Sequence, residues 1–453
     1  MHTTSPRHGR HRAMASALLG LLLVGTLSVS AHAASTREDQ WFLDAMKAEQ
    51  MWQTSTGKGI KVAVIDTGVD PTNPDLKGRI LPGKDYAEDQ PGDEHTDYEG
   101  HGTGMAGLIA GTGAYGGGEG AFGLAPGAEI LPIRMPKAAA AANQAAASRQ
   151  FNEVAPKAIR YAVDAGAQVI NISLAQAEGS PQLTAAVKYA LDNGSLIFAG
   201  AGNDGDKANE VMYPAATPGV VAMAAVGRDL RRTEESQHGP QVDMAAPGEE
   251  LVHACGSETG LCDSHGTSGA TALASASAAL IWSKHPTWTN NQVLRVMLNT
   301  IGAPTDGAKR NDSIGYGIVR PRIALQNPGD PGPADEYPLP DLAAAASASP
   351  SPEPSSTDSP GKEKSTEKTA SASKNSTMVW IVLGGIAAAL LGGAITGVVF
   401  VRKHRAPKAV PSPVTTYPPG QLQHPAPHYP PSPYSPPNTS GHNAPTDRGT
   451  GST

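Results

Sequence analysis

Three polar residues in separate glycine-rich segments have the types and the chain order that a hydrolase needs. Asp66 follows an apolar run, His101 lies in Gly-His-Gly-Thr-Gly, and Ser268 lies in Gly-Thr-Ser-Gly. A serine hydroxyl is a weak nucleophile at neutral pH, but a neighbouring imidazole can take its proton, and a buried carboxylate can hold that imidazole in the correct tautomer. Together the three segments predict a proton relay for nucleophilic catalysis.

Asp66 is expected at the end of a buried strand. The run 60–65 is apolar except for Lys61 and lies between Gly59 and Gly68, a pattern typical of such a strand. The carboxyl ends of strands are where open α/β sheets build their sites. Taken alone, a carboxylate there also fits an ATPase or a metal site.

His101 and Ser268 are each expected to begin a helix. Small residues follow His101, which suits a helix pressed tightly against the sheet. The stretch 270–282 is rich in alanine and other small or apolar residues and predicts a buried helix. Its free N–H groups and positive dipole end would place Ser268 beside a site for an oxyanion. Taken singly, a His with satisfied hydrogen bonds and a Ser N-cap are the alternatives.

Asn203 follows a fourth segment, a predicted buried strand that begins near Ser195 and runs into a glycine turn. Its amide can donate to the oxygen that becomes negative in acyl transfer, together with the backbone N–H of Ser268. Loss of such a donor costs roughly 3–4 kcal/mol of barrier. The alternative is an asparagine that supplies left-handed turn geometry.

With these four ordered motifs, the chain resembles the subtilisin-type (S8) serine peptidases from about Gln40 to Gln326. The resemblance implies a three-layer α/β fold, with a mostly parallel sheet and helices on both faces. It also implies catalysis by Asp66, His101 and Ser268 with Asn203 as an oxyanion donor. The substrate would lie against Ser173, Leu174, Ala175, Gly200, Ala201 and Gly202.

Further segments agree with the family, and some depart from it. Met212-Tyr-Pro-Ala215 resembles a family segment in which the proline is usually cis. Three alanines stand where the family usually has Pro or Gly: Ala272, Ala276 and Ala175. These departures put substrate preference and helix packing in question more than catalysis. His265 is also unusual, and we expect it to face solvent.

More narrowly, the chain resembles the mycosins, membrane-anchored subtilases of actinobacterial type VII secretion systems. The evidence is Gln40-Trp41, the segment 48–52, Gly57-Lys-Gly-Ile60 and the predicted topology. The resemblance implies an extracytoplasmic serine endopeptidase that acts on a protein or peptide. The alternative is a mainly structural component of a secretion membrane complex whose proteolysis is dispensable. The intact catalytic set argues against a pseudoprotease.

Composition divides the chain into six predicted parts. A basic N-terminus, an apolar run and Ala31-His-Ala33 predict a secretory signal peptide, with an uncleaved anchor as the alternative. The uncharged run before Arg402-Lys-His-Arg405 predicts one transmembrane helix with a cytoplasmic C-terminus. The parts are the signal peptide 1–33, a wrapping N-terminal extension 34–59, the peptidase domain 60–326, a disordered linker 327–377, the transmembrane helix 378–401 and a Pro-rich cytoplasmic tail 402–453.

The only two cysteines, Cys255 and Cys262, predict a disulfide in an exported protein, with two free thiols as the alternative. Closing so short a loop contributes roughly 2.5 kcal/mol at most. We expect the bond to stiffen the approach to Ser268.

The remaining features restrict the partners. The net charge of −7 over 453 residues and the absence of a basic patch give no support for nucleic-acid binding. No calcium loop or His/Cys cluster is apparent, so we expect no metal and no cofactor. The acidic stretch 88–99 could steer basic substrates, but a solvated loop is the simpler interpretation. The alanine-rich insertion 136–150 is expected beside the cleft. The N-terminal extension is expected to wrap the domain, with autoinhibition as the alternative.

Overall fold

The structure, a computed structural model, describes residues 35–256 and 259–348. The predicted signal peptide, transmembrane helix and cytoplasmic tail lie outside these residues, as does most of the predicted linker. Within the described ranges, no helix combines the length and the apolar character needed to cross a bilayer.

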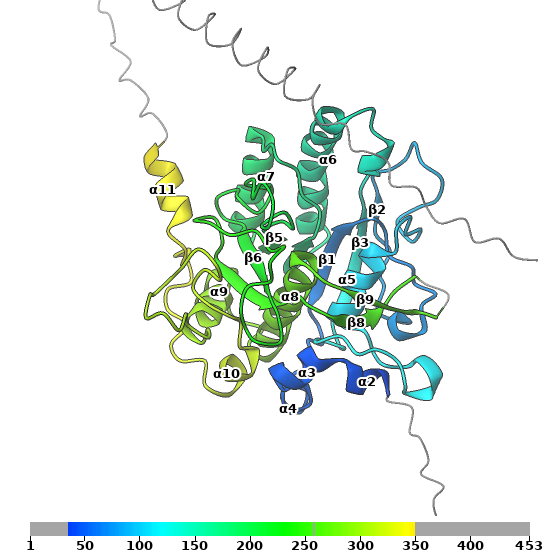
Figure 1. Cartoon of the computed structure of the whole chain (residues 1–453), viewed down its shortest axis with the longest axis horizontal. Coiled ribbons are helices and arrows are strands. Elements are labelled where there is room, and N and C mark those ends of the chain that lie inside the picture. Colours follow the sequence, from blue (N-terminus) through cyan, green and yellow to red (C-terminus); the bar gives the residue numbers. More distant parts are fainter. Residues whose placement is uncertain (1–34, 257–258, 349–453) are drawn as a thin grey trace, which may run out of the picture. The chain divides into compact units, whose positions relative to one another are not determined.

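Seven strands form the central sheet in the order β2-β3-β1-β4-β5-β6-β7 (Figure 1). All neighbouring pairs are parallel. A parallel sheet covered on both faces needs almost continuous apolar strands, and every residue of β4 to β7 is buried. The strands are β1 Lys61–Asp66, β2 Lys84–Asp85, β3 Glu129–Arg134, β4 Val169–Ile172, β5 Leu196–Gly200, β6 Val221–Val226 and β7 Met244–Pro247.

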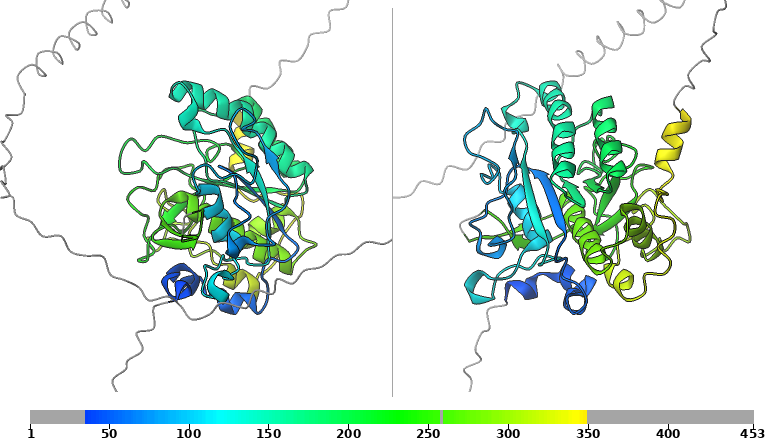
Figure 2. Two further views of the ribbon diagram at one scale, coloured as in Figure 1. Left: turned by 90° about the vertical axis from the view of Figure 1, so that its right-hand side faces the viewer. Right: turned by 180° about the vertical axis from the view of Figure 1, so that it is seen from behind.

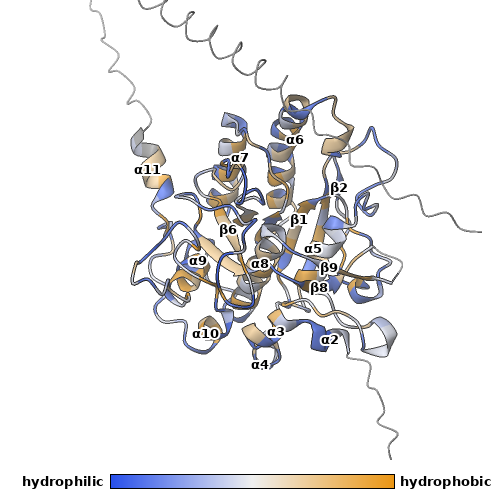
Figure 3. Cartoon of the chain, viewed as in Figure 1, coloured by the Kyte–Doolittle hydropathy of each residue, from blue (hydrophilic) through white to orange (hydrophobic). Residues whose placement is uncertain are grey.

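Helices cover both faces of this sheet, as Figure 2 shows from two further sides. Strand β1 demonstrates the two faces, because Val62 and Val64 belong to one apolar cluster and Ala63 and Ile65 to the other. The first cluster contains α5 (His101–Ala110), α8 (Thr267–Lys284) and α9 (Asn290–Asn299), and the second contains α6 (Gln144–Asp164) and α7 (Pro181–Asp192). Figure 3 shows hydrophobic residues concentrated on the strands between these layers. The predicted three-layer α/β fold is confirmed.

Shorter elements complete the described chain. Strands β8 (Leu251–Ala254) and β9 (Leu261–Ser264) form a separate antiparallel pair. The short helices are α2 Thr36–Asp39, α3 Trp41–Met46, α4 Ala48–Trp52, η1 Pro74–Leu76, η2 Tyr115–Gly117, η3 Ala138–Ala140, α10 Pro321–Gln326 and α11 Asp341–Ala348.

The strand order places a crevice beside Asp66. The chain goes from β1 to β3 on one side of the sheet, whereas β4 to β7 extend the other side. Loops therefore diverge at the carboxyl ends of β1 and β4, the position where open α/β sheets bind ligands. Asp66 is the last residue of β1.

The helix after the predicted nucleophile is continuous and almost wholly buried. Ala272 and Ala276, which replace the usual proline and glycine of the family, are both fully buried in α8. The helix also buries the polar side chains of Thr271 and Ser277. Their hydroxyls are satisfied because each donates to a backbone carbonyl one turn earlier in α8. The two departures therefore leave the helix and its packing intact.

The N-terminal extension packs against the domain as expected. Phe42 and Leu43 are fully buried in the main apolar cluster. The buried Gln40 side chain donates to the carbonyls of Phe122 and Val252 at 2.8 and 2.9 Å. Ser55 donates to the carbonyl of Leu280, in the C-terminal part of α8. Ser268 lies at the other end of that helix, about 18 Å away at 1.5 Å per residue.

Phe42→Ala is expected to lower the free energy of unfolding by about 3–5 kcal/mol, because it removes a fully buried ring and leaves a cavity. Denaturant unfolding of the full chain measures the change. Leu230→Ala is the control, because Leu230 is more than half exposed and such surface changes stay within about 0.5 kcal/mol. Equal stability of the two variants would contradict the wrapping role.

The packed domain continues beyond Gln326, the boundary predicted from sequence. Arg295 donates to the carbonyls of Pro331, Pro333 and Glu336, and Leu339 is buried. The Asp341 carboxylate accepts from Gly219 N at 2.5 Å. Composition gave no sign of this, because the segment is held mainly through its backbone carbonyls. The linker prediction needs correction over residues 327–341.

Candidate active site

Asp66 and His101 form the pair predicted from the sequence. His101 Nδ1 lies 2.7 Å from Asp66 Oδ1, and the same oxygen accepts from Thr67 N at 2.8 Å. Asp66 is fully buried, whereas the His101 side chain is about one-third exposed. Because a carboxylate accepts only, Nδ1 carries the proton and Nε2 is the nitrogen free to act as a base.

Close backbone packing places His101 against the end of β1. Gly100 has φ +78°, and His101 is the first residue of α5. A Cβ on Gly102 would lie 2.1 Å from Gly68 O and 3.1 Å from the Asp66 Cβ. Only glycine therefore lets the first turn of α5 approach Asp66 so closely.

Asp97 fixes the loop before His101, a role that the sequence did not reveal. Its Oδ1 accepts from Thr67 Oγ1 at 2.7 Å and from Gly100 N at 2.8 Å. Its Oδ2 accepts from Thr103 N and Oγ1 at 2.8 and 2.6 Å. One residue of the acidic stretch thus joins β1 to the start of α5. The stretch also contains exposed residues such as Glu88, which pairs with Lys84, and substrate steering stays a prediction.

The surrounding carboxylates raise the pKa of His101 to about 9, from an ordinary 6.5. The Asp66 charge is the largest cause, burial opposes it, and Asp97 and Glu99 add to it. The protonated pair therefore stabilises the fold fully below pH 6.5, and this contribution is lost as the pH rises through about 9. A base must be neutral to accept a proton, so any reaction it assists should accelerate over the same range.

Glu99→Gln is expected to lower the pKa of His101 and move the rising limb of the pH–rate profile to lower pH. Glu99 is exposed and is the smallest of the named causes, so the shift should be modest. The rate of Ser268 modification by a fluorophosphonate, measured against pH, checks this. Glu88→Gln is the control, because Glu88 is not among the groups that shift His101. This electrostatic account would be contradicted if the rising limb of Glu99→Gln moved to higher pH. It would also be contradicted if the limb moved equally in Glu99→Gln and Glu88→Gln.

Ser268 is the second residue of α8, which lies beside α5. The Leu108 side chain, near the C-terminal end of α5, lies 3.4 Å from the position of a Cβ on Gly269, so α5 packs against the start of α8. Ser268 Oγ donates to Ser173 O at 3.4 Å. The hydrogen bonds of the described residues do not include one between Ser268 and His101. Catalytic hydrogen bonds are often long or misaligned in a free enzyme and tighten when substrate binds.

Asn203 lies beside the nucleophile in a defined orientation. Its Oδ1 accepts from Thr267 N at 2.8 Å and from Thr267 Oγ1 at 3.0 Å. Because the Thr267 N–H can only donate, the atom facing it must be the amide oxygen. The Nδ2 group therefore points away from Thr267, and the residue is exposed. This orientation leaves the amide protons free for an oxyanion.

The predicted substrate residues fall into two groups. Leu174 and Ala175 line a cavity of about 120 Å³, and Ser173 contacts the backbone of Ser268. Gly200 and Ala201 are fully buried, and a Cβ on Gly200 would lie 2.8 Å from Thr267 Oγ1. The side chain of Ala201 belongs to an apolar core cluster, which leaves its backbone for substrate contact, and the assignment of Ala201 to the substrate site stays a prediction. Gly202 is partly exposed and donates to Thr267 Oγ1.

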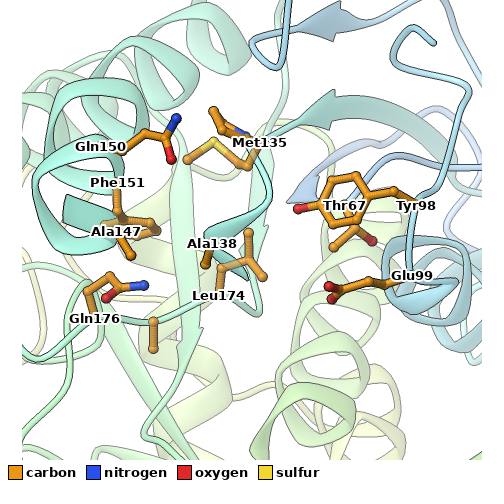
Figure 4. A pocket seen from close by; sticks show the side chains of 12 residues that line it. Thr67, Tyr98, Glu99, Met135, Ala138, Ala147, Gln150, Phe151, Leu174 and Gln176 are labelled. Atoms are coloured by element: carbon orange, nitrogen blue, oxygen red, sulfur yellow. The ribbon is translucent and has the colours of Figure 1, made fainter. Parts of the chain in front are cut away.

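Figure 4 shows the cavity between two groups of side chains. Thr67, Tyr98 and Glu99 form one wall, and Phe151, Ala147 and Gln176 stand opposite. The insertion 136–150 borders it through Pro136, Ala138, Ala147 and Gln150, as expected. Lys137 lies 3.6 Å from Glu99 and over the Tyr98 ring. The interior therefore suits an apolar side chain beneath a charged rim.

Comparison with known proteins agrees with this geometry. The model of the subtilase family (peptidase S8) matches residues 57–317, more than half of the chain. The chain belongs to the subtilase family. The major intracellular serine protease of Bacillus subtilis (strain 168) is 37% identical over 216 residues, 46% of this chain and 65% of the relative. Subtilisin E of the same organism is 36% identical over 53% of this chain and 60% of the relative. The matched part of this subtilase thus spans less than two-thirds of these relatives.

Solved structures relate this subtilase to the mycosins. MycP1 from Mycobacterium smegmatis has a TM-score of 0.55 at 29% identity, covering 65% of this chain and 86% of that one. MycP3 protease from the type VII (ESX-3) secretion system has a TM-score of 0.54 at 34% identity, covering 63% and 87%. The predicted mycosin relationship is confirmed.

The predictions for the two cysteines, for Pro214 and for His265 can be compared with the structure of this subtilase. Cys255 and Cys262 form a disulfide with an S–S distance of 2.05 Å. The Tyr213–Pro214 bond is cis, as the resemblance implied. The His265 side chain is three-quarters exposed and lies 3.4 Å from Glu235, so it faces solvent as expected. In the described part of the chain, no group of three or more His, Cys, Asp or Glu residues could hold a metal.

Proposed function

We propose that this subtilase is a serine endopeptidase that cleaves peptide bonds through an acyl-enzyme on Ser268. The observation that supports this most strongly is the buried Asp66 bound to His101 Nδ1, which orients the other ring nitrogen as a base. Further support is that α5, which begins with His101, packs against the first turn of α8, which contains Ser268.

In the first step, Ser268 Oγ attacks the peptide carbonyl carbon while His101 Nε2 takes the hydroxyl proton. The carbonyl oxygen becomes negative, and the Ser268 N–H and Asn203 Nδ2 donate to it. His101 then gives its proton to the leaving amine nitrogen as the carbon–nitrogen bond breaks. Water repeats the sequence: His101 takes its proton, the ester is cleaved, and the proton returns to Ser268.

The cavity beside the crevice supports a preference for an apolar residue in the substrate. Leu174, Phe151 and Met135 provide an apolar lining, and the neighbouring Glu99–Lys137 pair lies at the rim. Burial of an apolar side chain there would contribute about 25 cal/mol per Å² of surface removed from water. A charged side chain would lose hydration without gaining a buried partner.

A fluorophosphonate probe tests the peptidase proposal. Its phosphorus is attacked by an activated serine with loss of fluoride, and the adduct is identified by peptide mapping. We expect one adduct, on Ser268, in the full chain, and none in Ser268→Ala. Ser283→Ala is the control, because Ser283 is partly exposed and donates to Lys58 O far from the crevice. Absence of an adduct on Ser268 would refute the peptidase assignment.

We also propose that the subtilase is anchored in the cell membrane by residues 378–401, with its catalytic domain outside and its C-terminus in the cytoplasm. The support is the uncharged apolar run followed by Arg402-Lys-His-Arg405, the signal-like pattern of residues 1–33, and a disulfide typical of exported proteins. External protease added to intact cells should digest the catalytic domain and spare a C-terminal tag. The reverse pattern would refute this topology.

A role in a type VII secretion complex is the third proposal. A chain in the periplasmic assembly from the ESX-5 inner membrane complex matches 74% of this chain and 90% of its own length, at 26% identity and a TM-score of 0.55. Secretion in cells that carry only Ser268→Ala distinguishes two forms of this role. Normal secretion with this variant, and its loss on deletion of the gene, would favour a structural role with dispensable proteolysis.

A further inference from the structure

A second histidine, His253, is buried close to the catalytic pair. It lies in β8 and is 3% exposed. Its Nδ1 lies 2.9 Å from Ala254 O, and its Nε2 lies 2.9 Å from Ser264 Oγ on β9. A carbonyl only accepts, so Nδ1 carries the proton and Nε2 accepts from the Ser264 hydroxyl. The neutral ring therefore satisfies both partners.

The charge state agrees with this assignment. Burial lowers the pKa of His253, and the positive charge of protonated His101 lowers it further. The hydrogen bond to Ala254 and the charge of Asp263 act in the opposite direction. Because burial is the largest of these effects, the ring is neutral at the pH where His101 would act as a base.

The imidazole of His253 also contacts the helix that carries His101. A Cβ on Gly104, one turn after His101, would lie 2.6 Å from the His253 Cε1 atom. A Cβ on Gly107 would lie 2.5 Å from Ala254 O. Helix α5 therefore lies directly on β8 through two glycines, and the ring of His253 fills the space beside Gly104.

The partner of His253 belongs to the strand that leads to the nucleophile. Ser264 ends β9, and only three residues separate it from Ser268. At the other end of the β8–β9 pair, a disulfide joins Cys255, which directly follows β8, to Cys262 in β9, and Cys262 pairs with His253 in the sheet register. The Asn73 side chain donates to the carbonyls of Cys255 and Gly260. The strand pair is thus held at the end where the chain connects β8 to β9, with His253 between α5 and β9.

We propose that His253 and Ser264 are positioning residues that fix the distance between His101 and Ser268. The ring sets where α5 lies, and its hydrogen bond to Ser264 ties that helix to the strand that ends before the nucleophile. This inference rests on the proposed peptidase function. A displacement of about 1 Å between reacting groups can cost about 100-fold in rate, so the pair should influence the chemical step more than substrate binding.

The test measures Ser268 modification by the fluorophosphonate in the full chain, with the maximal rate constant and the half-saturating concentration determined separately. Ser264→Ala and His253→Leu should each lower the maximal rate constant about 10- to 100-fold and leave the half-saturating concentration unchanged. His253→Gln retains a donor and an acceptor and should recover part of the loss. Ser195→Ala is the matched control, because Ser195 is buried and donates to a single carbonyl, that of Ala167. It should lower the melting temperature and leave the rate constant unchanged.

Three results would overturn the proposal. The first is a rate constant within two-fold of wild type in both Ser264→Ala and His253→Leu. The second is an equal loss in Ser195→Ala, which would indicate general destabilisation. The third is the absence of modification in the wild-type chain, which would refute the peptidase function and this inference together. Wild-type modification with unaffected variants would refute the positioning role alone.

Discussion

Ser268→Ala is expected to lower kcat for peptide hydrolysis by about 10⁶-fold, the size of effect that removal of this residue type has in a subtilisin. The variant loses the only atom that can form the acyl-enzyme, whereas the Asn203 amide and the Ser268 backbone N–H remain. A residual rate above that in water should therefore persist. Hydrolysis of a fluorogenic peptide, calibrated by active-site titration of the wild type, measures the difference.

The stability of this variant should hardly change. The hydroxyl of Ser268 makes one long contact, 3.4 Å to Ser173 O, and the residue is not fully buried. A change within about 0.5 kcal/mol is expected from denaturant unfolding. Activity that stays within ten-fold of wild type would contradict the role of Ser268. A loss of activity that is explained by unfolding of the variant would also contradict this role.

Asp66→Asn is expected to lower kcat by about 10⁴-fold. The asparagine amide can donate where the carboxylate only accepts, so His101 can adopt the tautomer with its proton on Nε2, which cannot act as a base toward Ser268. The largest cause of the raised His101 pKa is also removed. The pH–rate profile should therefore reach its plateau at lower pH than in the wild type, whose rising limb should lie near pH 9.

A full pH–rate profile of Asp66→Asn, with Asp75→Asn as the control, separates these effects from general damage. Asp75 is also a buried carboxylate, and it accepts from Tyr115 N and Ala121 N away from the crevice. The control should lose stability and keep the wild-type profile. Profiles that shift alike in the two variants, or a limb of Asp66→Asn that moves to higher pH, would contradict the assigned role of Asp66.

The positions of the catalytic residues could be predicted because local sequence determines them. A β-branched run that ends at Asp66, and glycines that flank His101 and Ser268, encode a strand end and two helix starts within a few residues. The position of Asn203 could be predicted in the same way, because the strand that precedes it and the glycine turn that contains it are adjacent in the sequence. The layers on both faces followed from the family resemblance, and the alternation along β1 explains them physically.

The structure added residues whose roles depend on contacts between distant parts of the chain. Asp97 appears in the sequence as one acid among several, yet its two oxygens bind Thr67, Gly100 and Thr103. His253 lies in no recognisable sequence motif. Its proposed role depends on its contact with α5, where Gly104 has no side chain and so leaves room for the imidazole ring. No local pattern encodes such a pairing. Gly104, in the glycine-rich segment after His101, became informative only beside His253.

A peptidyl chloromethyl ketone tests the central claim, the shared site of His101 and Ser268, most directly. In such a site the serine adds to the ketone carbonyl, and the nearby imidazole displaces chloride, so one inhibitor links both residues. Peptide mapping should find one alkylated histidine, His101, and the modification should be lost in Ser268→Ala. Modification of the exposed His265 instead, or of His101 at the same rate without Ser268, would show that the two residues do not act together.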